Sequence, residues 1–297
     1  MIDRICISLN ARCNQNCLYC HFSEKKNNVH SVDNEFTPEE IKQFCLNLYD
    51  YITEYKLPLF KLGIVGSGEP LLSMNSLKTL VEFFYYSEIR DVMRIYVISN
   101  GTLLNADIID FFFFYKNIVE LNISLDGDPE TNARFRGASY PDLSGYEKKF
   151  GCKPRINSVV TQETLLHKTK IISFFRENNF NQINFSKIFG VNDSKIKITD
   201  DEYNAFLLYA KSFGIESRQN HFAKKYDCTK YGNLCGVGRN NVFITRTGIY
   251  PCGRFMDLKE YILGSWTDSL KIIENKMGKF IPCPDGECYY EYNEVKK

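Results

Sequence analysis

Three cysteines near the start of the chain have the type and spacing of metal ligands. Cys13, Cys17 and Cys20 form a C-x3-C-x2-C pattern, in a chain of 297 residues with eleven cysteines. The first ten residues lack the long apolar stretch and small-residue cleavage site of a secretory signal. We therefore expect a cytoplasmic protein, in which clustered thiols bind metal or perform redox chemistry instead of forming disulfides.

A second group of cysteines lies near the end of the chain. Its members are Cys228, Cys235, Cys252, Cys283 and Cys288. They predict a second metal site, and thiolates in such a site bind zinc as well as iron–sulfur clusters, so a zinc knuckle is an alternative. Either metal would stabilise a segment that shows little periodic apolar pattern.

The overall composition excludes several other classes of protein. Hydrophobic residues make up 44% and charged residues 25%, which is typical of a globular protein. The formal net charge is +1 and no long basic run occurs, so we expect no nucleic-acid partner. The most apolar stretch, residues 108–121, contains Asp110 and Lys116 and is too short to span a bilayer. We expect no membrane helix.

The elements that position the first cysteines alternate between strands and helices. Apolar runs predict strands at residues 2–9, 59–65, 93–99, 118–125, 155–160 and 182–188. Helical patterns occupy residues 37–55, 75–88, 106–115, 164–178 and 199–213, and two of them open on capping boxes, Thr37 with Glu40 and Thr199 with Glu202. This alternation predicts an α/β fold with parallel strands, a partial (β/α)6 TIM-like barrel. We expect the barrel in residues 1–220 and a small cysteine-rich domain in residues 221–297.

Polar and glycine residues follow the predicted strands. The first strand leads into the cysteine motif, the second into GSGEP at residues 66–70, the third into SNG at residues 99–101 and the fourth ends in SLDG at residues 124–127. Each of these sequences alone is typical of an ordinary turn. Because the carboxyl ends of parallel barrel strands meet on one rim, we expect all four segments to form one site.

The motifs CNQNCLYC, GSGEP, SNG and ISLDG, in this order, make residues 2–190 resemble the radical SAM superfamily. The resemblance implies that Cys13, Cys17 and Cys20 ligate three irons of a 4Fe-4S cluster. The fourth iron then keeps an open position, as a catalytic metal does, and binds S-adenosylmethionine. The implied chemistry is reductive cleavage to a 5'-deoxyadenosyl radical, which abstracts hydrogen from the substrate.

The same resemblance implies which residues contact S-adenosylmethionine. Tyr19, which precedes the third cysteine, is expected against the adenine. The other expected contacts are Ser67, Gly68 and Glu69 to the methionine amino group, Ser99, Asn100, Ser124 and Asp126 to the ribose hydroxyls, and Arg134 or Arg136 to the carboxylate. Ser67 stands where the family often has a glycine, and the sequence does not choose between the two arginines.

Residues 235–252 resemble the hairpin that opens the SPASM domain of radical SAM proteins, in its shortened twitch form. This implies one auxiliary 4Fe-4S cluster with Cys235, Cys252, Cys283 and Cys288 as ligands. Cys228 is left over, and it either replaces one of these ligands or acts as a catalytic thiol that gives a hydrogen atom to a substrate radical.

Members with such a tail often modify ribosomally made peptides by crosslinking, epimerisation or oxidation, so we expect a peptide substrate and a flavodoxin- or ferredoxin-type reductant. Because the first predicted strand begins at residue 2, leader recognition would need a separate protein. One alternative is a dehydrogenase or related enzyme acting on a small molecule such as a sugar or cyclitol. Another is a glycyl-radical enzyme activase, which CLYCH resembles locally. The last is a noncatalytic iron–sulfur or zinc module, with His21 or His30 as a zinc ligand.

Overall fold

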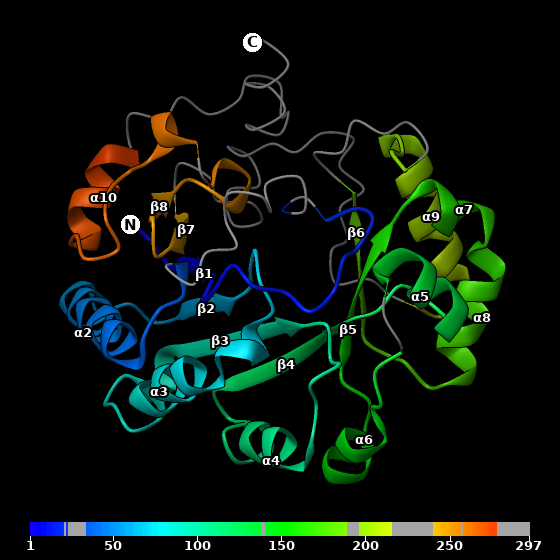
Figure 1. Ribbon diagram of the computed structural model, residues 1–297, viewed down its shortest axis with the longest axis horizontal. Coiled ribbons are helices and arrows are strands. Elements are labelled where there is room, and N and C mark those ends of the chain that lie inside the picture. Colours follow the sequence, from blue (N-terminus) through cyan, green and yellow to red (C-terminus); the bar gives the residue numbers. More distant parts are fainter. Residues whose placement is uncertain are drawn as a thin grey trace.

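One curved sheet of eight strands organises the molecule, with the order β6-β5-β4-β3-β2-β1-β7-β8 (Figure 1). The computed structural model describes residues 1–20, 22, 34–137, 140–188, 196–215, 240–256 and 258–277. The strands are β1 (Arg4–Ile7), β2 (Phe60–Ile64), β3 (Met93–Ser99), β4 (Val119–Ser124), β5 (Arg155–Val160), β6 (Ile183–Lys187), β7 (Asn241–Thr245) and β8 (Gly248–Tyr250). Neighbouring strands are parallel except for the antiparallel pair β7 and β8.

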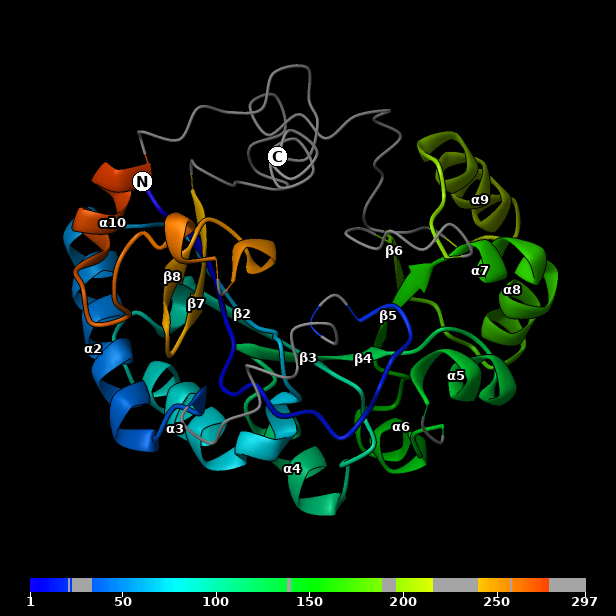
Figure 2. The ribbon, with the colours of Figure 1, turned by 45° about the horizontal axis from the view of Figure 1, so that its top comes forward.

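Helices cover the convex side of this sheet, as the second view shows (Figure 2). The larger ones are α2 (Pro38–Tyr55), α3 (Met74–Tyr85), α4 (Ala106–Phe114), α8 (Lys168–Glu177) and α9 (Asp200–Ser212). Shorter ones are α5 (Pro129–Arg136), α6 (Ser144–Phe150), α7 (Gln162–Leu166) and α10 (Leu270–Met277). The predicted α/β partial barrel is confirmed, and all six predicted strands are present as β1 to β6.

The two capping boxes form as the sequence predicts. The Thr37 side chain accepts from the Glu40 N–H, and the Glu40 carboxylate accepts from the Thr37 N–H, which begins α2. Thr199 and Glu202 make the same reciprocal pair at the start of α9. These caps satisfy backbone donors that a helix start leaves unpaired, and they hold helices whose apolar side covers the sheet.

The helices differ from the sequence prediction in two ways, one divided helix and three additional ones. The helix expected over residues 164–178 is divided into α7 and α8, because Thr161 caps a separate short helix and the chain turns at His167. Helices α5, α6 and α10 were not predicted. In α5, Asp128 accepts from the N–H groups of Glu130 and Thr131, and Pro129 occupies the first turn, so a start signal was present in the sequence.

The two faces of the sheet differ in character. Ile5, Leu62 and Ile95 point to the helices and are at most 3% exposed, within one continuous apolar core. The alternate residues, such as Lys61 and Tyr96, lie on the concave face. Burial of each large helix-facing side chain contributes about 1.5–3 kcal/mol. A shift of one residue would turn these side chains to the other face, so their burial fixes the register between neighbouring strands and therefore the position of the strand ends.

The hairpin of β7 and β8 joins the barrel sheet directly, because β7 pairs in parallel with β1. Residues 216–239 and 278–297 lie outside the described residues, so the domain boundary at residue 220 stays a prediction. Within the described ranges, no helix combines the length and the apolar character that crossing a membrane requires.

Candidate active site

The Glu69 carboxylate joins the ends of β2 and β3. It accepts hydrogen bonds from the Ser99 hydroxyl (2.7 Å), the Asn100 N–H (2.8 Å) and the Leu71 N–H (3.0 Å). The side chain is buried, and burial raises the pKa of this carboxyl above its ordinary value although the three hydrogen bonds oppose the shift. Glu69 therefore fixes two of the predicted motifs to each other.

The end of β1 carries two polar residues that the sequence analysis did not single out. The Ser8 hydroxyl lies 3.1 Å from the Ser67 hydroxyl, and the Asn10 amide donates to the Glu69 carbonyl (3.0 Å) and to Ser73 (2.6 Å). Both residues follow an apolar strand, as the other motif residues do, and this position was the available signal. They join the first strand to the second.

Gly68 lies where no side chain fits. A Cβ atom added there would come within 2.0 Å of Asn10 Oδ1, 2.5 Å of the Arg12 carbonyl oxygen and 2.7 Å of the Asn10 carbonyl oxygen. Two of these atoms belong to the backbone of the segment that leads into the cysteines. The glycine therefore allows the cysteine segment to lie directly on the end of β2.

The cysteine segment runs from β1 across the strand ends toward α5 (Figure 2). The Asn100 amide donates to Asn14 Oδ1 (2.7 Å), which binds the segment to the end of β3. Further on, the Leu18 N–H donates to the Phe135 carbonyl of α5 (2.8 Å). The predicted convergence of the strand ends on the cysteines is thus present in the described residues.

A buried group of three side chains holds the end of the cysteine segment in place. The Tyr19 hydroxyl donates to Asp126 Oδ2, and Arg136 Nε lies 2.8 Å from the same oxygen as an ion pair. The Asp126 side chain is fully buried, and its Oδ1 accepts from the Val159 N–H (2.9 Å). Although burial disfavours a charged guanidinium, Asp126 raises the pKa of Arg136, so the guanidinium stays charged.

The three N-terminal thiols are partly buried, and the Cys17 thiol lies near this ion pair. Burial raises the pKa of the Cys17 thiol to about 11, Arg136 lowers it, and the nearby Cys20 and Cys13 thiols raise it. No three described His, Cys, Asp or Glu residues come close enough to hold a single metal ion. A 4Fe-4S cluster instead takes its thiolates on different iron atoms, and three thiols beside a buried cation fit such a donor set.

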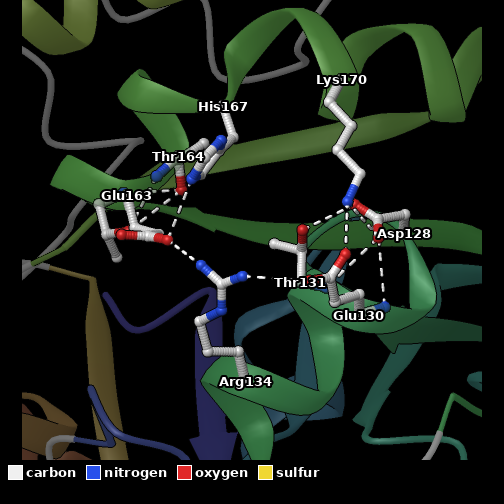
Figure 3. A network of polar contacts seen from close by, with 9 residues as sticks. Asp128, Glu130, Thr131, Arg134, Glu163, Thr164, His167 and Lys170 are labelled. Carbon is white, nitrogen blue, oxygen red and sulfur yellow. Dashed lines mark hydrogen bonds and ion pairs between the residues drawn. The ribbon is translucent and has the colours of Figure 1, made fainter.

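The structure separates the two candidate arginines. Arg136 belongs to the buried group, whereas Arg134 points away from it and binds Glu163 and Glu130 (Figure 3). In the same surface network Lys170 of α8 reaches Asp128 and Glu130. Of the two arginines, Arg136 therefore binds the carboxylate that also holds Tyr19 of the cysteine segment.

Of the remaining predicted residues, two lie in the described part of the chain and the others lie outside it. The Ser124 side chain lies half-buried at the end of β4, and its hydroxyl makes no hydrogen bond with a described residue. Cys252 follows the hairpin and is half-buried. The other C-terminal cysteines of the prediction, Cys228, Cys235, Cys283 and Cys288, lie outside the described residues, as do His21 and His30.

Residues 7–145 match the Radical SAM superfamily. A probable GTP 3',8-cyclase of Methanococcus aeolicus is 29% identical over 187 residues, which are 59% of this chain and 56% of that protein. A cysteine-type anaerobic sulfatase-maturating enzyme of Clostridium novyi is 26% identical over 191 residues, 59% of this chain and 48% of its own. The chain thus spans about half the length of these two relatives.

The fold also resembles that of solved proteins. Streptococcus suis SuiB, in a crystal structure with the precursor peptide SuiA, has a TM-score of 0.74 and 16% sequence identity, with 100% of this chain and 73% of that chain covered. The likeness to SuiB shows the fold. The strand-end motifs and the family match together show that residues 7–145 carry a radical SAM superfamily domain.

Proposed function

We propose that the protein holds a 4Fe-4S cluster on Cys13, Cys17 and Cys20, binds S-adenosylmethionine beside it, and abstracts hydrogen from a peptide. The observation that supports this most directly is the hydrogen-bonded junction of the strand ends with the cysteine segment, made by Glu69, Asn100 and Asp126. Such a junction holds the three thiols in place before any cofactor binds.

When bound, the reduced cluster supplies one electron that cleaves S-adenosylmethionine into methionine and a 5'-deoxyadenosyl radical, and this radical removes a hydrogen atom from the substrate. The residues of the chain position and shield this chemistry. Asp126 and Arg136 fix the end of the cysteine segment, and the positive charge of Arg136 favours the thiolate form of Cys17. Glu69 is buried, so its junction excludes water from the floor of the site.

A peptide substrate is favoured by two likenesses. The fold matches SuiB, solved with the precursor peptide SuiA, along the whole chain. One sequence relative is named a sulfatase-maturating enzyme, and its name implies a protein substrate. These likenesses support the peptide class and leave the bond that is formed open.

A small-molecule substrate is the second candidate. It is favoured by the relative named probable GTP 3',8-cyclase, whose name identifies a nucleotide as the reactant. The two candidates differ in what would stimulate cofactor cleavage, so one assay separates them.

The cleavage itself is tested on anaerobically reconstituted protein with dithionite and S-adenosylmethionine, by chromatography of released 5'-deoxyadenosine. We expect slow release without substrate, and none above background from Cys13→Ala or Cys17→Ala. Cys152→Ala is the matched control, because this thiol is exposed and lies after α6. Release that persists in the Cys13 and Cys17 variants would overturn the proposal.

The substrate class is tested in the same assay with synthetic peptides from short reading frames beside the gene, and with GTP. We expect a peptide, and not GTP, to stimulate release and to return with a changed mass. Stimulation by GTP alone assigns the small-molecule class instead.

We further propose that Cys235, Cys252, Cys283 and Cys288 hold an auxiliary 4Fe-4S cluster in a separate C-terminal domain, and that Cys228 acts as a catalytic thiol. Two clusters correspond to about eight iron atoms per chain. Cys252→Ala should halve the iron content, whereas Cys228→Ala should keep it and lose only peptide conversion. An unchanged iron content in Cys252→Ala, or iron lost in Cys228→Ala, would reassign the ligands.

A further inference from the structure

A cavity of about 600 Å³ opens inside the curve of the sheet, among the strands β2 to β6. Its lining includes Lys61, Arg94, Arg155 and Asn184, each within the first two residues of its strand. The cysteine segment follows the carboxyl end of β1, so the cavity lies toward the opposite end of the parallel strands. Its volume is typical of a site for a small molecule.

Three cations stand in a row beside this cavity. Arg4 of β1 is in register with Lys61 of β2, and Lys61 is in register with Arg94 of β3. Residues in register on neighbouring strands share one face and lie about 5 Å apart. Like charges in this arrangement repel each other, so the row destabilises the isolated sheet.

The positive charge at the cavity is largely uncompensated. Among the described lining residues, Lys61, Arg94, Lys116 and Arg155 are cations, and Glu120 is the single carboxylate. Glu120 Oε1 lies 2.9 Å from Arg155 Nη1. Within the described residues Lys61, Arg94 and Lys116 form no ion pair, and Arg94 is oriented by the backbone carbonyls of Asp91 and Met93.

Asparagines on the next three strands leave polar groups at the cavity. Asn122 of β4 is only 5% exposed, and its side chain makes no hydrogen bond with a described residue. The Asn184 amide donates to Asn157 Oδ1 (2.9 Å), but the enclosed atoms Asn157 Nδ2 and Asn184 Oδ1 have no hydrogen-bond partner among the described residues. Polar groups of buried residues are nearly always hydrogen-bonded, so the Asn122 side chain at the cavity favours a bound polar molecule.

We propose that this cavity binds a small anion, a molecule with phosphate or carboxylate groups. Ammonium and guanidinium groups bind such oxygens through charge-assisted hydrogen bonds, and the free amide of Asn122 adds a neutral donor. Binding would also relieve the repulsion between Lys61 and Arg94. The inference does not rest on the proposed peptide reaction, because the cavity lies away from the cysteine segment.

The test is calorimetric titration of the full-length, anaerobically prepared protein with pyrophosphate and with citrate, without S-adenosylmethionine. We expect one site per chain, with tighter binding of pyrophosphate if the natural ligand is a phosphate and of citrate if it is a carboxylate. Lys61→Gln and Arg94→Gln should each weaken binding about tenfold, because each removes a charge-assisted contact. Asn122→Asp should abolish binding, since it keeps the shape and adds a negative charge.

Two further variants make the result independent of folding defects. Glu120→Gln should tighten binding severalfold, and a gain of affinity does not arise from misfolding. Lys78→Gln is the matched control, because Lys78 is an exposed lysine of α3. It should leave the affinity unchanged.

The proposal is overturned if neither anion binds at millimolar concentration, or if Lys78→Gln weakens binding as much as Lys61→Gln does. Protein that binds an anion but releases no 5'-deoxyadenosine contradicts only the proposed reaction. The reverse result contradicts only the anion site.

Discussion

The polar side chains at the two ends of the barrel strands differ in how fully other protein groups pair with them. At the carboxyl ends, Glu69 and Asp126 are buried and every carboxylate oxygen accepts from the protein itself. At the amino ends, Lys61 and Arg94 lie side by side without a carboxylate partner in the described residues. The first end is internally satisfied, whereas the second retains charge that an added ligand would satisfy.

This difference indicates how each end is suited to its task. A site that must hold reactive thiols benefits from groups already locked by their neighbours. A binding site instead tolerates a lower stability of the free protein, because the bound ligand then stabilises the folded state. Substitutions at the two ends should therefore change stability in opposite directions, and four experiments examine this contrast.

The largest effect should come from Asp126→Asn. This change leaves the buried Arg136 without a carboxylate, and breaking such a pair typically destabilises a protein by about 3–5 kcal/mol. Urea unfolding of the anaerobic protein measures it, and release of 5'-deoxyadenosine should fall to background. Asp110→Asn, which breaks an exposed ion pair with Lys149, should have little effect. If Asp126→Asn and Arg136→Met prove additive in the double variant, the two residues are not coupled.

Gly68→Ala should cause the second-largest loss of stability. Its methyl group would collide with backbone atoms of Asn10 and Arg12, and overpacking of this kind costs about 3 kcal/mol at the upper end of its usual range. Gly151→Ala is the comparison, because nothing lies within 4 Å of the added atom and only its left-handed φ of 72° opposes alanine, at about 1 kcal/mol. Equal losses in thermal and urea unfolding would show that the contact at Gly68 is unimportant.

Glu69→Gln tests the junction through pH. At neutral pH the amide replaces an acceptor of three hydrogen bonds, at a loss of about 1–3 kcal/mol. Because burial raises the pKa of Glu69, the native state binds a proton more tightly than the unfolded state, whose carboxyl titrates near 4.5. The advantage of the wild type over Glu69→Gln should therefore shrink as pH rises from 4.5 through the raised pKa, and then stay constant. A difference in unfolding free energy that is the same at every pH would contradict the raised pKa.

The smallest effect, and one of opposite sign, should come from Lys61→Gln. Removal of one member of the cation row should raise the free energy of unfolding by about 0.2–1 kcal/mol at low salt. The gain should fade as salt screens the charges. Destabilisation by Lys61→Gln would mean that the positive charge of Lys61 already has a favourable partner in the protein. The proposed difference between the two strand ends would then be wrong.

The sequence predicted those features that depend on neighbouring residues. Thr37 and Glu40 are three residues apart, and such a capping box forms wherever the helix begins, so the start of α2 was predictable. Apolar runs identified β1 to β6 because these strands bury their helix-facing side chains in the core. The cysteine spacing likewise pointed to the correct superfamily.

The features that could not be predicted depend on the pairing of distant residues. Tyr19 and Asp126 are 107 residues apart, and only the folded chain brings them together. Arg134 and Arg136 stand two positions apart on α5, about 200° around the helix, so one is buried while the other is exposed. The sequence alone carries no information on which of them turns inward. The row of Arg4, Lys61 and Arg94 depends on strand register, which no single strand reveals.

The pairing of β7 with β1 has a consequence for synthesis. Strand β1 is made first, yet one of its two hydrogen-bonding partners begins only at Asn241. While the ribosome still holds the later residues, the nascent chain presents the free side of β1 as an open edge, which other chains are able to join. Strand β7 therefore shields the segment that leads into the cysteines only after Thr245 has been synthesised.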